Sequence, residues 1–235
     1  MTTLVTVAHG TRHAPGNDVA RTLTGMAARS LGVAAVAAYV ELCEPSLADV
    51  MASATGPTVV VPLLLSTGFH VRHDLPGAAA RATSPVRIAP PLGPDRVLAV
   101  AQATRLVEAG ARPGQPVVLV AAGSTDPEAE ADVELATALL ADLWGGPVEH
   151  ATLSGRGPRP AEVVRPGVAV SPYLLSPGHF ARRARAESLE AGAEIVADVI
   201  GAQHCLVDLV ATRFLTHPVD VGGDVRGREP LDRLG

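Results

Sequence analysis

The sequence predicts an α/β protein of two similar lobes, each a four-stranded parallel sheet flanked by helices, with the active site in the cleft between them. Three observations support this prediction. Strand-like runs alternate with helical stretches, which is typical of parallel sheets with helical crossovers. The run PTVVVPLLLS (57–66) is almost wholly apolar, as expected for a strand buried on both faces. The pattern of the first half then starts again near residue 116.

The first half contains four strands and three helices in an order that follows the hydrophobic pattern. In the first helix Val19, Leu23 and Met26 keep helical spacing, and Pro45 fits the first turn of the second helix. Gly110 is a suitable residue to end the last helix. The expected order is strand 3–9, helix 17–31, strand 33–41, helix 45–54, strand 57–66, strand 86–91 and helix 95–110.

The second half repeats this order. The run 117–146 repeats 4–32, and VAVSPYLLSPGH (168–179) stands for TVVVPLLLSTGF (58–69). We therefore expect a first lobe at 1–113, a degenerate second lobe at 114–221 and a disordered polar tail at 222–235. Parallel sheets bind ligands beyond the C-terminal ends of their strands, and a cleft between two lobes deepens such a site.

Composition excludes several classes of protein. The net charge of −5 argues against a nucleic-acid partner, and no apolar run reaches the roughly 20 residues of a membrane span. The first ten residues resemble a strand rather than a signal peptide, and two cysteines are too few for a disulfide framework. We expect a soluble cytoplasmic protein without a membrane partner. Because duplication already supplies two facing lobes in one chain, we expect a monomer.

The two halves differ where their strands end. Three polar residues at C-terminal strand ends of the first half are absent from the second half. In the alignment of the two repeats, His9 corresponds to Ala122, Glu41 to Ser154 and His70 to Phe180. The fold constrains both copies alike, so such differences indicate chemistry rather than folding. Two imidazoles and one carboxylate at a sheet edge suit a divalent transition metal and leave coordination positions open.

Other polar residues have simpler interpretations. Glu44 competes with Glu41 but belongs to a helix start, where an acidic residue is favourable, and Cys43 suits a small buried position. His73 suits an exposed helix or a role behind His70. The loop HGTRHAPGN lacks both common nucleotide-binding glycine motifs. Five histidines do not belong to a matched set of strand-end positions like that of His9 and His70, and we expect them to be structural: His13, His150, His179, His204 and His217.

Four motifs in order resemble those of the sirohydrochlorin chelatases, the class II tetrapyrrole chelatases, in their long duplicated form. They are AHGTR, YVELCEPSLADV, VVVPLLLSTGFHVRHDLP and PPLGPD, with Thr11 in place of the more usual serine. The resemblance implies insertion of a divalent metal into sirohydrochlorin, a tetrapyrrole with eight carboxylates. It also implies that His9 and His70 hold or deliver the metal and that Glu41 corresponds to the family's acidic residue.

The implied chemistry suits these residue types. Metal insertion requires the loss of two pyrrole N–H protons, and a neutral imidazole can accept a proton or hold the metal, but not both at once. His9 and Glu41 are therefore the expected catalytic residues. We expect the anionic substrate to contact these positions: Arg12, Glu41, Leu65, Ser66, Thr67, Gly68, Phe69, Arg72, Arg182, Arg183 and Arg185. For the last three, a solvated helix face is the alternative.

No permanently bound cofactor is expected, because the metal is a substrate. Ligand type does not separate Fe²⁺ from Co²⁺, and we choose iron, since the long form often serves sirohaem. Cobalt insertion toward a corrinoid is the alternative within the enzyme hypothesis. Two other hypotheses stay open: a metal or tetrapyrrole carrier without turnover, and a metal-free binder of a small molecule between two lobes.

Overall fold

The computed structural model describes residues 1–68, 72 and 74–219, and contains two four-stranded, all-parallel sheets. The first has the order β2-β1-β3-β4 and the second the order β6-β5-β7-β8. This confirms the predicted fold class. The strands are β1 (Thr3–Ala8), β2 (Ala35–Tyr39), β3 (Thr58–Pro62), β4 (Val86–Ile88), β5 (Val117–Ala121), β6 (Val148–Thr152), β7 (Ala169–Tyr173) and β8 (Ile195–Val196).

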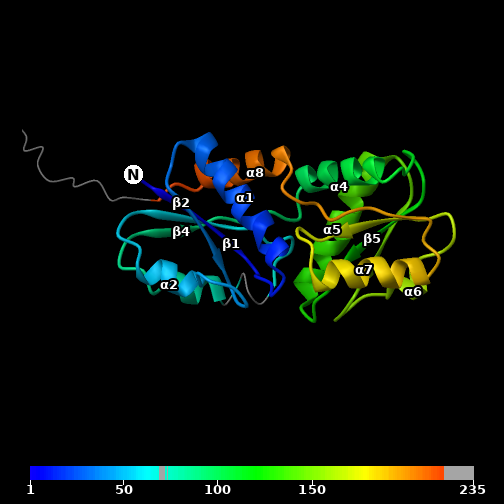
Figure 1. Ribbon diagram of the computed structural model, residues 1–235, viewed down its shortest axis with the longest axis horizontal. Helices are drawn as coiled ribbons and strands as arrows, with labels where there is room; N and C mark the ends of the chain where they lie inside the picture. Colours follow the sequence, from blue (N-terminus) through cyan, green and yellow to red (C-terminus); the bar gives the residue numbers. More distant parts are fainter. Residues whose placement is uncertain (69–71, 73, 220–235) are drawn as a thin grey trace, which may run out of the picture.

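Helices cover both faces of each sheet (Figure 1). All five residues of β3 and of β5 are buried, which explains why every residue of the two strands except Thr58 is apolar. The first helix begins at residue 14, three residues before the predicted start, because Pro15 fits a first helical turn. The helices are α1 (Ala14–Leu31), α2 (Leu47–Ala52), α3 (Leu75–Ala79), α4 (Arg96–Glu108), α5 (Pro127–Trp144), α6 (Pro160–Val163), α7 (His179–Glu190) and α8 (His204–Thr216).

The two halves exchange their last helices. Helix α4 follows the first sheet in the chain but packs against α5 and β7, whereas α8 follows the second sheet and packs against α1 and β3 (Figure 1). An arginine on each exchanged helix forms a hydrogen bond with the backbone of the lobe against which the helix packs. The Arg105 side chain donates to the carbonyl oxygen of Ile200 at 3.1 Å, and that of Arg213 donates to the carbonyl oxygen of Pro91 at 3.2 Å. The sequence repeat and the packed lobe therefore differ by one helix.

The exchange gives both lobes one shared core. A single cluster of buried apolar side chains includes Leu23 of α1, Leu119 of β5 and Leu206 of α8. Separate clusters fill the outer faces, beneath α2 and α3 in one lobe and beneath α6 and α7 in the other. Burial of this shared apolar surface holds the lobes, and hence the ends of their strands, in a fixed relation.

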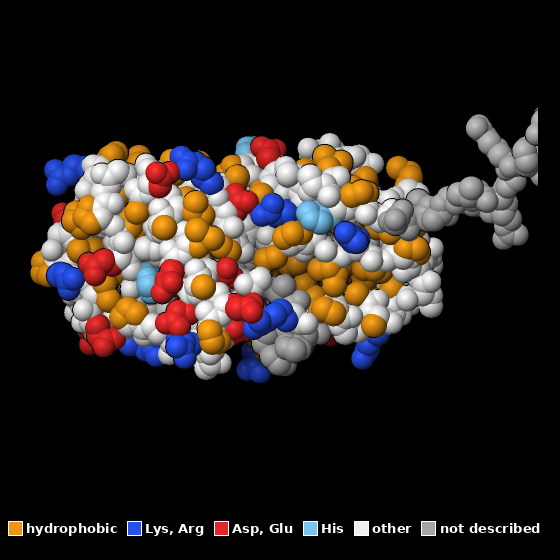
Figure 2. Space-filling view, turned by 180° about the vertical axis from the view of Figure 1, so that it is seen from behind, with side chains coloured by type: hydrophobic (Ala, Val, Ile, Leu, Met, Phe, Trp, Pro, Cys, Tyr) orange, Lys and Arg blue, Asp and Glu red, His pale blue; other side chains and the backbone are white. Residues whose placement is uncertain are grey.

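The surface differs between the lobes. Figure 2 shows acidic side chains gathered on the second lobe, and a hollowed area of hydrophobic side chains on the first. Within the described residues, no helix is long and apolar enough to cross a membrane. The predicted tail at 222–235 lies outside the described residues.

Candidate functional site

The ionisable pair at the first sheet's C-terminal edge consists of His9 and Glu41. His9 directly follows β1, and Glu41 lies two residues beyond β2, which pairs with β1. The backbone N–H of Glu41 donates to the carbonyl oxygen of His9 at 3.0 Å, so the two turns are joined. The His9 Nε2 and Glu41 Oε1 atoms are 3.3 Å apart, and the side chains are 47% and 51% exposed. A ligand can therefore reach both groups at once.

Glycines form the turns at both sheet edges. Gly10 has a φ of +94°, and a Cβ there would collide with the carbonyl oxygen of Glu41. Gly123 has the same geometry, with a φ of +85° and the same conflict with Ser154. Beyond the shared turn, the chemistry differs. In the second lobe the Ser154 hydroxyl donates to the carbonyl oxygen of Ala122 at 2.7 Å, where the first lobe carries the ionisable pair.

The second predicted metal ligand, His70, lies outside the described residues, as do Phe69 and His73. In the ranges that are described, no group of three or more His, Cys, Asp and Glu side chains is arranged to hold a metal ion. His9 and Glu41 are thus the described part of the predicted metal site. The four preceding substrate-contact candidates, Leu65, Ser66, Thr67 and Gly68, follow β3 and are all half-buried.

A cavity of about 360 Å³ adjoins this edge and combines residues from both lobes. We call it the basic cavity. Leu42 is exposed at its wall and has a φ of +63°, an unfavourable backbone conformation for a leucine. In the described part of the chain, no side chain forms an ion pair with Arg12 or Arg182. The lining residues are Thr11, Arg12, His13, Leu42, His179 and Arg182.

The three arginines of α7 point in different directions. Only Arg182 lines the basic cavity. Arg183 pairs with Glu187 on its own helix at 2.8 Å and donates to the carbonyl oxygen of Leu153 at 2.9 Å. Arg185 donates to the carbonyl oxygen of Val196 at 3.2 Å. The three arginines therefore do not form the single cluster that the sequence predicts, and each lies in a different environment.

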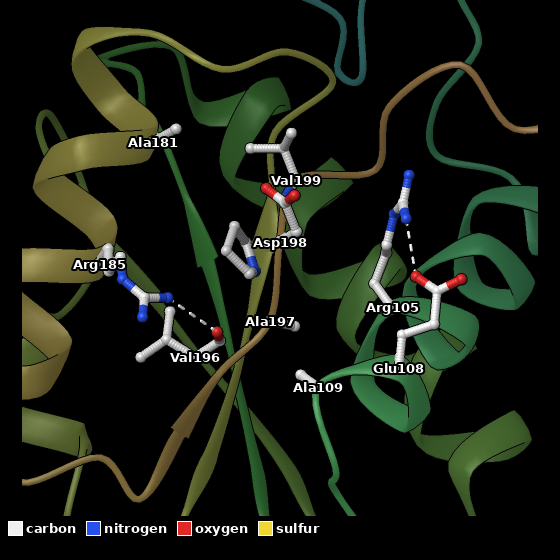
Figure 3. A pocket seen from close by; sticks show the side chains of 10 residues that line it. Arg105, Glu108, Ala109, Ala181, Arg185, Val196, Ala197, Asp198 and Val199 are labelled. Atoms are coloured by element: carbon white, nitrogen blue, oxygen red, sulfur yellow. Dashed lines mark hydrogen bonds and ion pairs between the residues drawn. The ribbon is translucent and has the colours of Figure 1, made fainter.

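Arg185 belongs to a second cavity, of about 490 Å³, at the edge of the second sheet. Figure 3 shows Arg185 on α7 and Arg105 on α4 at opposite sides of this cavity, with Asp198 between them. Arg105 pairs with Glu108 at 2.7 Å. The cavity contains neither His9 nor Glu41 among its lining residues.

Arg72 is ion-paired rather than open to a ligand. Its guanidinium pairs with Asp126 and with Glu128, the latter at 2.5 Å. The hydrogen bond to Asp126 raises the pKa of Arg72 above its usual value, so the guanidinium stays charged. Both acidic residues belong to the second lobe. Arg72 therefore joins the lobes, which the sequence analysis did not anticipate.

Two histidines expected to be structural, His13 and His179, line the basic cavity. Comparison of the two repeats contains the sequence signal that could have identified this region. At the start of its first helix each lobe faces an arginine from the other, and the second lobe presents Asp126 and Glu128 where the first presents His13 and Pro15. Acidic residues are thus absent from one of two related positions, which leaves the arginine there open.

Comparison with known proteins identifies the family of this chain. The CbiX family matches residues 3–109 and 116–216, one match for each repeat. The chain belongs to the CbiX family. Membership agrees with the resemblance inferred from the four sequence motifs.

Individual relatives of this CbiX-family chain are similar over different lengths. Sirohydrochlorin ferrochelatase of Bacillus subtilis (strain 168) is 34% identical over 161 residues, which span 60% of this chain and 60% of that protein. The structure of SirB from Bacillus subtilis with Fe³⁺ is 26% identical with a TM-score of 0.75, and covers 90% of this chain and 93% of SirB. The structure of CbiX described as the terminal enzyme of sirohaem biosynthesis in denitrifying bacteria is 21% identical with a TM-score of 0.69, over 91% and 98% of the two chains.

Proposed function

We propose that this protein inserts a divalent metal, Fe²⁺, into sirohydrochlorin. The observation that carries the proposal is the His9–Glu41 pair, 3.3 Å apart and open to solvent at a sheet edge whose counterpart in the second lobe has neither group. Membership of the CbiX family and the name of the 34%-identical relative support this activity and substrate. Structures of SirB contain Fe³⁺ in one case and cobalt in another, so they support a transition-metal substrate, and the choice of iron rests on the name of the 34%-identical ferrochelatase.

The proposed reaction exchanges one metal dication for two protons. Each pyrrole N–H that becomes a metal ligand must lose its proton to a base. In the proposal His9, together with His70, holds the incoming metal through a ring nitrogen, and Glu41 accepts the first proton. The second proton passes to the imidazole nitrogen that becomes free once the metal has moved to the pyrrole nitrogens. This division is required because one imidazole nitrogen lone pair cannot bind a metal and a proton at once. Open coordination positions then allow pyrrole nitrogens to replace water stepwise.

The basic cavity suits the carboxylates of the same substrate. Arg12 and Arg182 approach it from different lobes, and among the described residues neither has an ion-pair partner, so both guanidinium groups can form paired hydrogen bonds with carboxylates. The local charge is needed because the protein as a whole is acidic, with a net charge of −5. We therefore assign carboxylate binding to Arg12 and Arg182, and not to Arg72, Arg183 or Arg185, which are engaged elsewhere.

Two exposed apolar side chains border the same region. Leu42 lines the basic cavity and is 50% exposed. Phe180 is 39% exposed and contacts the ring of the lining residue His179, with ring centroids 5.5 Å apart. A macrocycle has flat apolar faces and a charged rim, so an apolar surface beside free arginines suits it. We propose that Leu42 and Phe180 contact the ring while the arginines contact the rim.

The decisive experiment is a metallation assay at substoichiometric protein, followed by the absorbance change of sirohydrochlorin on addition of Fe²⁺. We expect multiple turnovers, and we expect His9→Ala to lower kcat by more than about 100-fold, because a removed ligand abolishes its site. His204→Ala, an exposed histidine at the start of α8, is the matched control and should retain wild-type activity. Metallation that stops at one equivalent per protein would instead identify a carrier, and faster turnover with Co²⁺ than with Fe²⁺ would identify a cobaltochelatase.

A further inference from the structure

One helix start in this protein already shows how an arginine from the other lobe binds two carboxylates. At the start of α5 the guanidinium of Arg72 pairs with both Asp126 and Glu128. Asp126 directly precedes the helix, and its carboxylate also accepts the backbone N–H of Glu128 at 3.0 Å. Both carboxylates belong to the protein itself, so this copy of the arrangement is already filled.

The start of α1 has a similar backbone but carries no acidic side chain. Helices α1 and α5 both have 18 residues, so His13 corresponds to Asp126 and Pro15 to Glu128. The residue before each helix is extended, with φ and ψ of −94° and 105° at His13 and of −78° and 124° at Asp126. The two helix starts therefore differ in the charge of their side chains rather than in the course of the chain.

The basic cavity lies at this unfilled helix start. Arg182 lines it from α7 and His13 from the start of α1, and the lining residues include no carboxylate. Neither α1 nor α7 has an acidic residue in its first turn, and neither has a side-chain cap. Further along α1, Asp18 pairs with Arg21 at 2.6 Å. Within the described residues, the positive ends of two helices thus add to the arginines of the cavity without an acidic side chain to balance them.

The filled copy indicates the chemistry of a ligand for the open copy. Two carboxylates from residues two positions apart reach the one guanidinium of Arg72. A ligand with two neighbouring carboxylates would reproduce that arrangement at Arg182. A tetrapyrrole with eight carboxylates carries two for each pyrrole ring on average, so the rim of one ring can present such a pair.

We propose that His13 is a specificity-determining residue for the substrate. Because its side chain is not acidic, it leaves Arg182 open, and the cavity accepts two neighbouring carboxylates of the tetrapyrrole in the place that Asp126 and Glu128 take at Arg72. The imidazole can itself donate an N–H to a carboxylate, and it adds a positive charge when protonated. The inference rests on the proposed function and deepens it, since it names the residue that keeps the carboxylate site open.

The first experiment measures binding of metal-free sirohydrochlorin to the full-length protein by fluorescence titration. His13→Asp copies the acidic residue of the other half and should weaken binding by roughly ten-fold or more, because Arg182 gains an internal partner and a like charge faces the ligand. Adding Pro15→Glu copies both acidic residues and should weaken binding further.

Two control variants separate charge from other effects. Asparagine precedes a helix as favourably as aspartate but is neutral, so His13→Asn should stay within about three-fold of the wild-type affinity. His204→Asp makes the same change of charge at the exposed start of α8 and should bind sirohydrochlorin like the wild type.

A second readout needs no ligand. His13→Asp should have a Tm roughly 1–4 °C above that of His13→Asn, because a new ion pair with Arg182 forms as Asp126 pairs with Arg72. Most of this difference should disappear when Arg182→Ala is added to both variants. A difference of the same size without Arg182, or no difference at all, would overturn the proposal, since position 13 would not reach that arginine.

Sirohydrochlorin affinity of His13→Asp within two-fold of wild type would also overturn it. Failure of the proposed function is distinguishable from both results. A wild type that binds sirohydrochlorin without metallating it disproves the enzyme activity alone, whereas unchanged binding in His13→Asp disproves the role of His13 in an active enzyme.

Discussion

Arg72 and Arg182 occupy equivalent positions in the two halves, but only Arg72 is ion-paired within the described part of the chain. Each lies four residues after a glycine and donates its backbone N–H to that glycine's carbonyl oxygen, at 3.2 Å for Arg72 and 3.1 Å for Arg182. Arg72 meets Asp126 and Glu128, whereas Arg182 lines the basic cavity beside His13. One copy of the same arginine thus joins the lobes, and the other remains available to an anion.

This difference predicts a selective effect on substrate binding. Arg182→Ala should raise KM for sirohydrochlorin, on the order of three- to ten-fold, because a partly exposed charge pair contributes about 0.2–1 kcal/mol and a paired guanidinium somewhat more. The value of kcat should change less, since a carboxylate far from the pyrrole nitrogens is bound alike in ground and transition states. Steady-state kinetics at low and high salt measures both effects, and high salt should reduce the difference.

The neighbouring residue supplies the control for this prediction. Arg183→Ala removes a guanidinium that pairs with Glu187 and contacts the carbonyl oxygen of Leu153, so its KM should match the wild type. Equal increases in KM for both variants would show that the helix acts through its general charge rather than through Arg182.

The two glycine turns predict a contrast between folding and activity. Gly10→Ala and Gly123→Ala introduce the same backbone conflict, with Glu41 and Ser154 respectively, and each places alanine at a positive φ. Each should lower the free energy of unfolding by at least about 1–2 kcal/mol. Only Gly10→Ala should also abolish metallation, because it moves His9 relative to Glu41. Chemical denaturation and the metallation assay, run on both variants, compare the two quantities; similar residual activity in both would argue against a site at the first sheet edge.

Leu42 combines an unfavourable backbone conformation with exposure at the basic cavity, which indicates a functional reason for the side chain. Leu42→Gly should leave the free energy of unfolding unchanged or raise it by up to about 1 kcal/mol, because glycine adopts a positive φ without strain. The same variant should bind sirohydrochlorin more weakly, as it loses an apolar contact with the ring. Fluorescence titration with metal-free tetrapyrrole measures this affinity, and unchanged affinity would remove Leu42 from the substrate site.

Much of the fold could be predicted from the sequence because its signals are local. Strand β3 is apolar after Thr58 since both of its faces are covered, and this pattern is visible in the sequence of the strand itself. The exchange of α4 and α8 has no such signal. Both helices follow equivalent strands with similar apolar faces, so either sheet could accept either helix, and long-range packing decides between them.

The site also has some features that the local sequence predicts and others that depend on long-range packing. His9 and Glu41 follow paired strands, and strand order alone brings them together. The grouping of Arg182, Arg183 and Arg185 neglected that successive residues on a helix point about 100° apart, so they cannot all face one cavity. The contact of Asp132 with Thr67 joins residues 65 positions apart in different lobes, which no local pattern reveals. The signal for this contact in the sequence is the difference between the repeats at the positions of Asp132 and Thr67.

The last prediction concerns alkaline pH and Tyr173, which donates to the Leu65 carbonyl oxygen. Burial strongly raises the pKa of this phenol, so it stays protonated, and able to donate, across the range of any metallation assay. In the unfolded chain a tyrosine ionises near pH 10, and above that pH the unfolded state releases a proton that the folded state retains. The phenol's contribution to stability is therefore fully present below about pH 10 and is lost above it, by up to about 1.4 kcal/mol per pH unit.

Tyr173→Phe tests this linkage. At neutral pH the variant should be less stable by about 1 kcal/mol, because the Leu65 carbonyl oxygen loses its donor. Above about pH 10 its free energy of unfolding should fall less steeply than that of the wild type, so the two curves converge. The chain has only two tyrosines, and burial raises the pKa of Tyr39 as well, so Tyr39→Phe leaves Tyr173 as the single phenol whose absorbance can be titrated. Parallel stability curves for wild type and Tyr173→Phe up to pH 11, or a Tyr173 phenolate signal that develops near pH 10 in folded Tyr39→Phe, would show that the phenol is not held in the buried contact between β7 and Leu65.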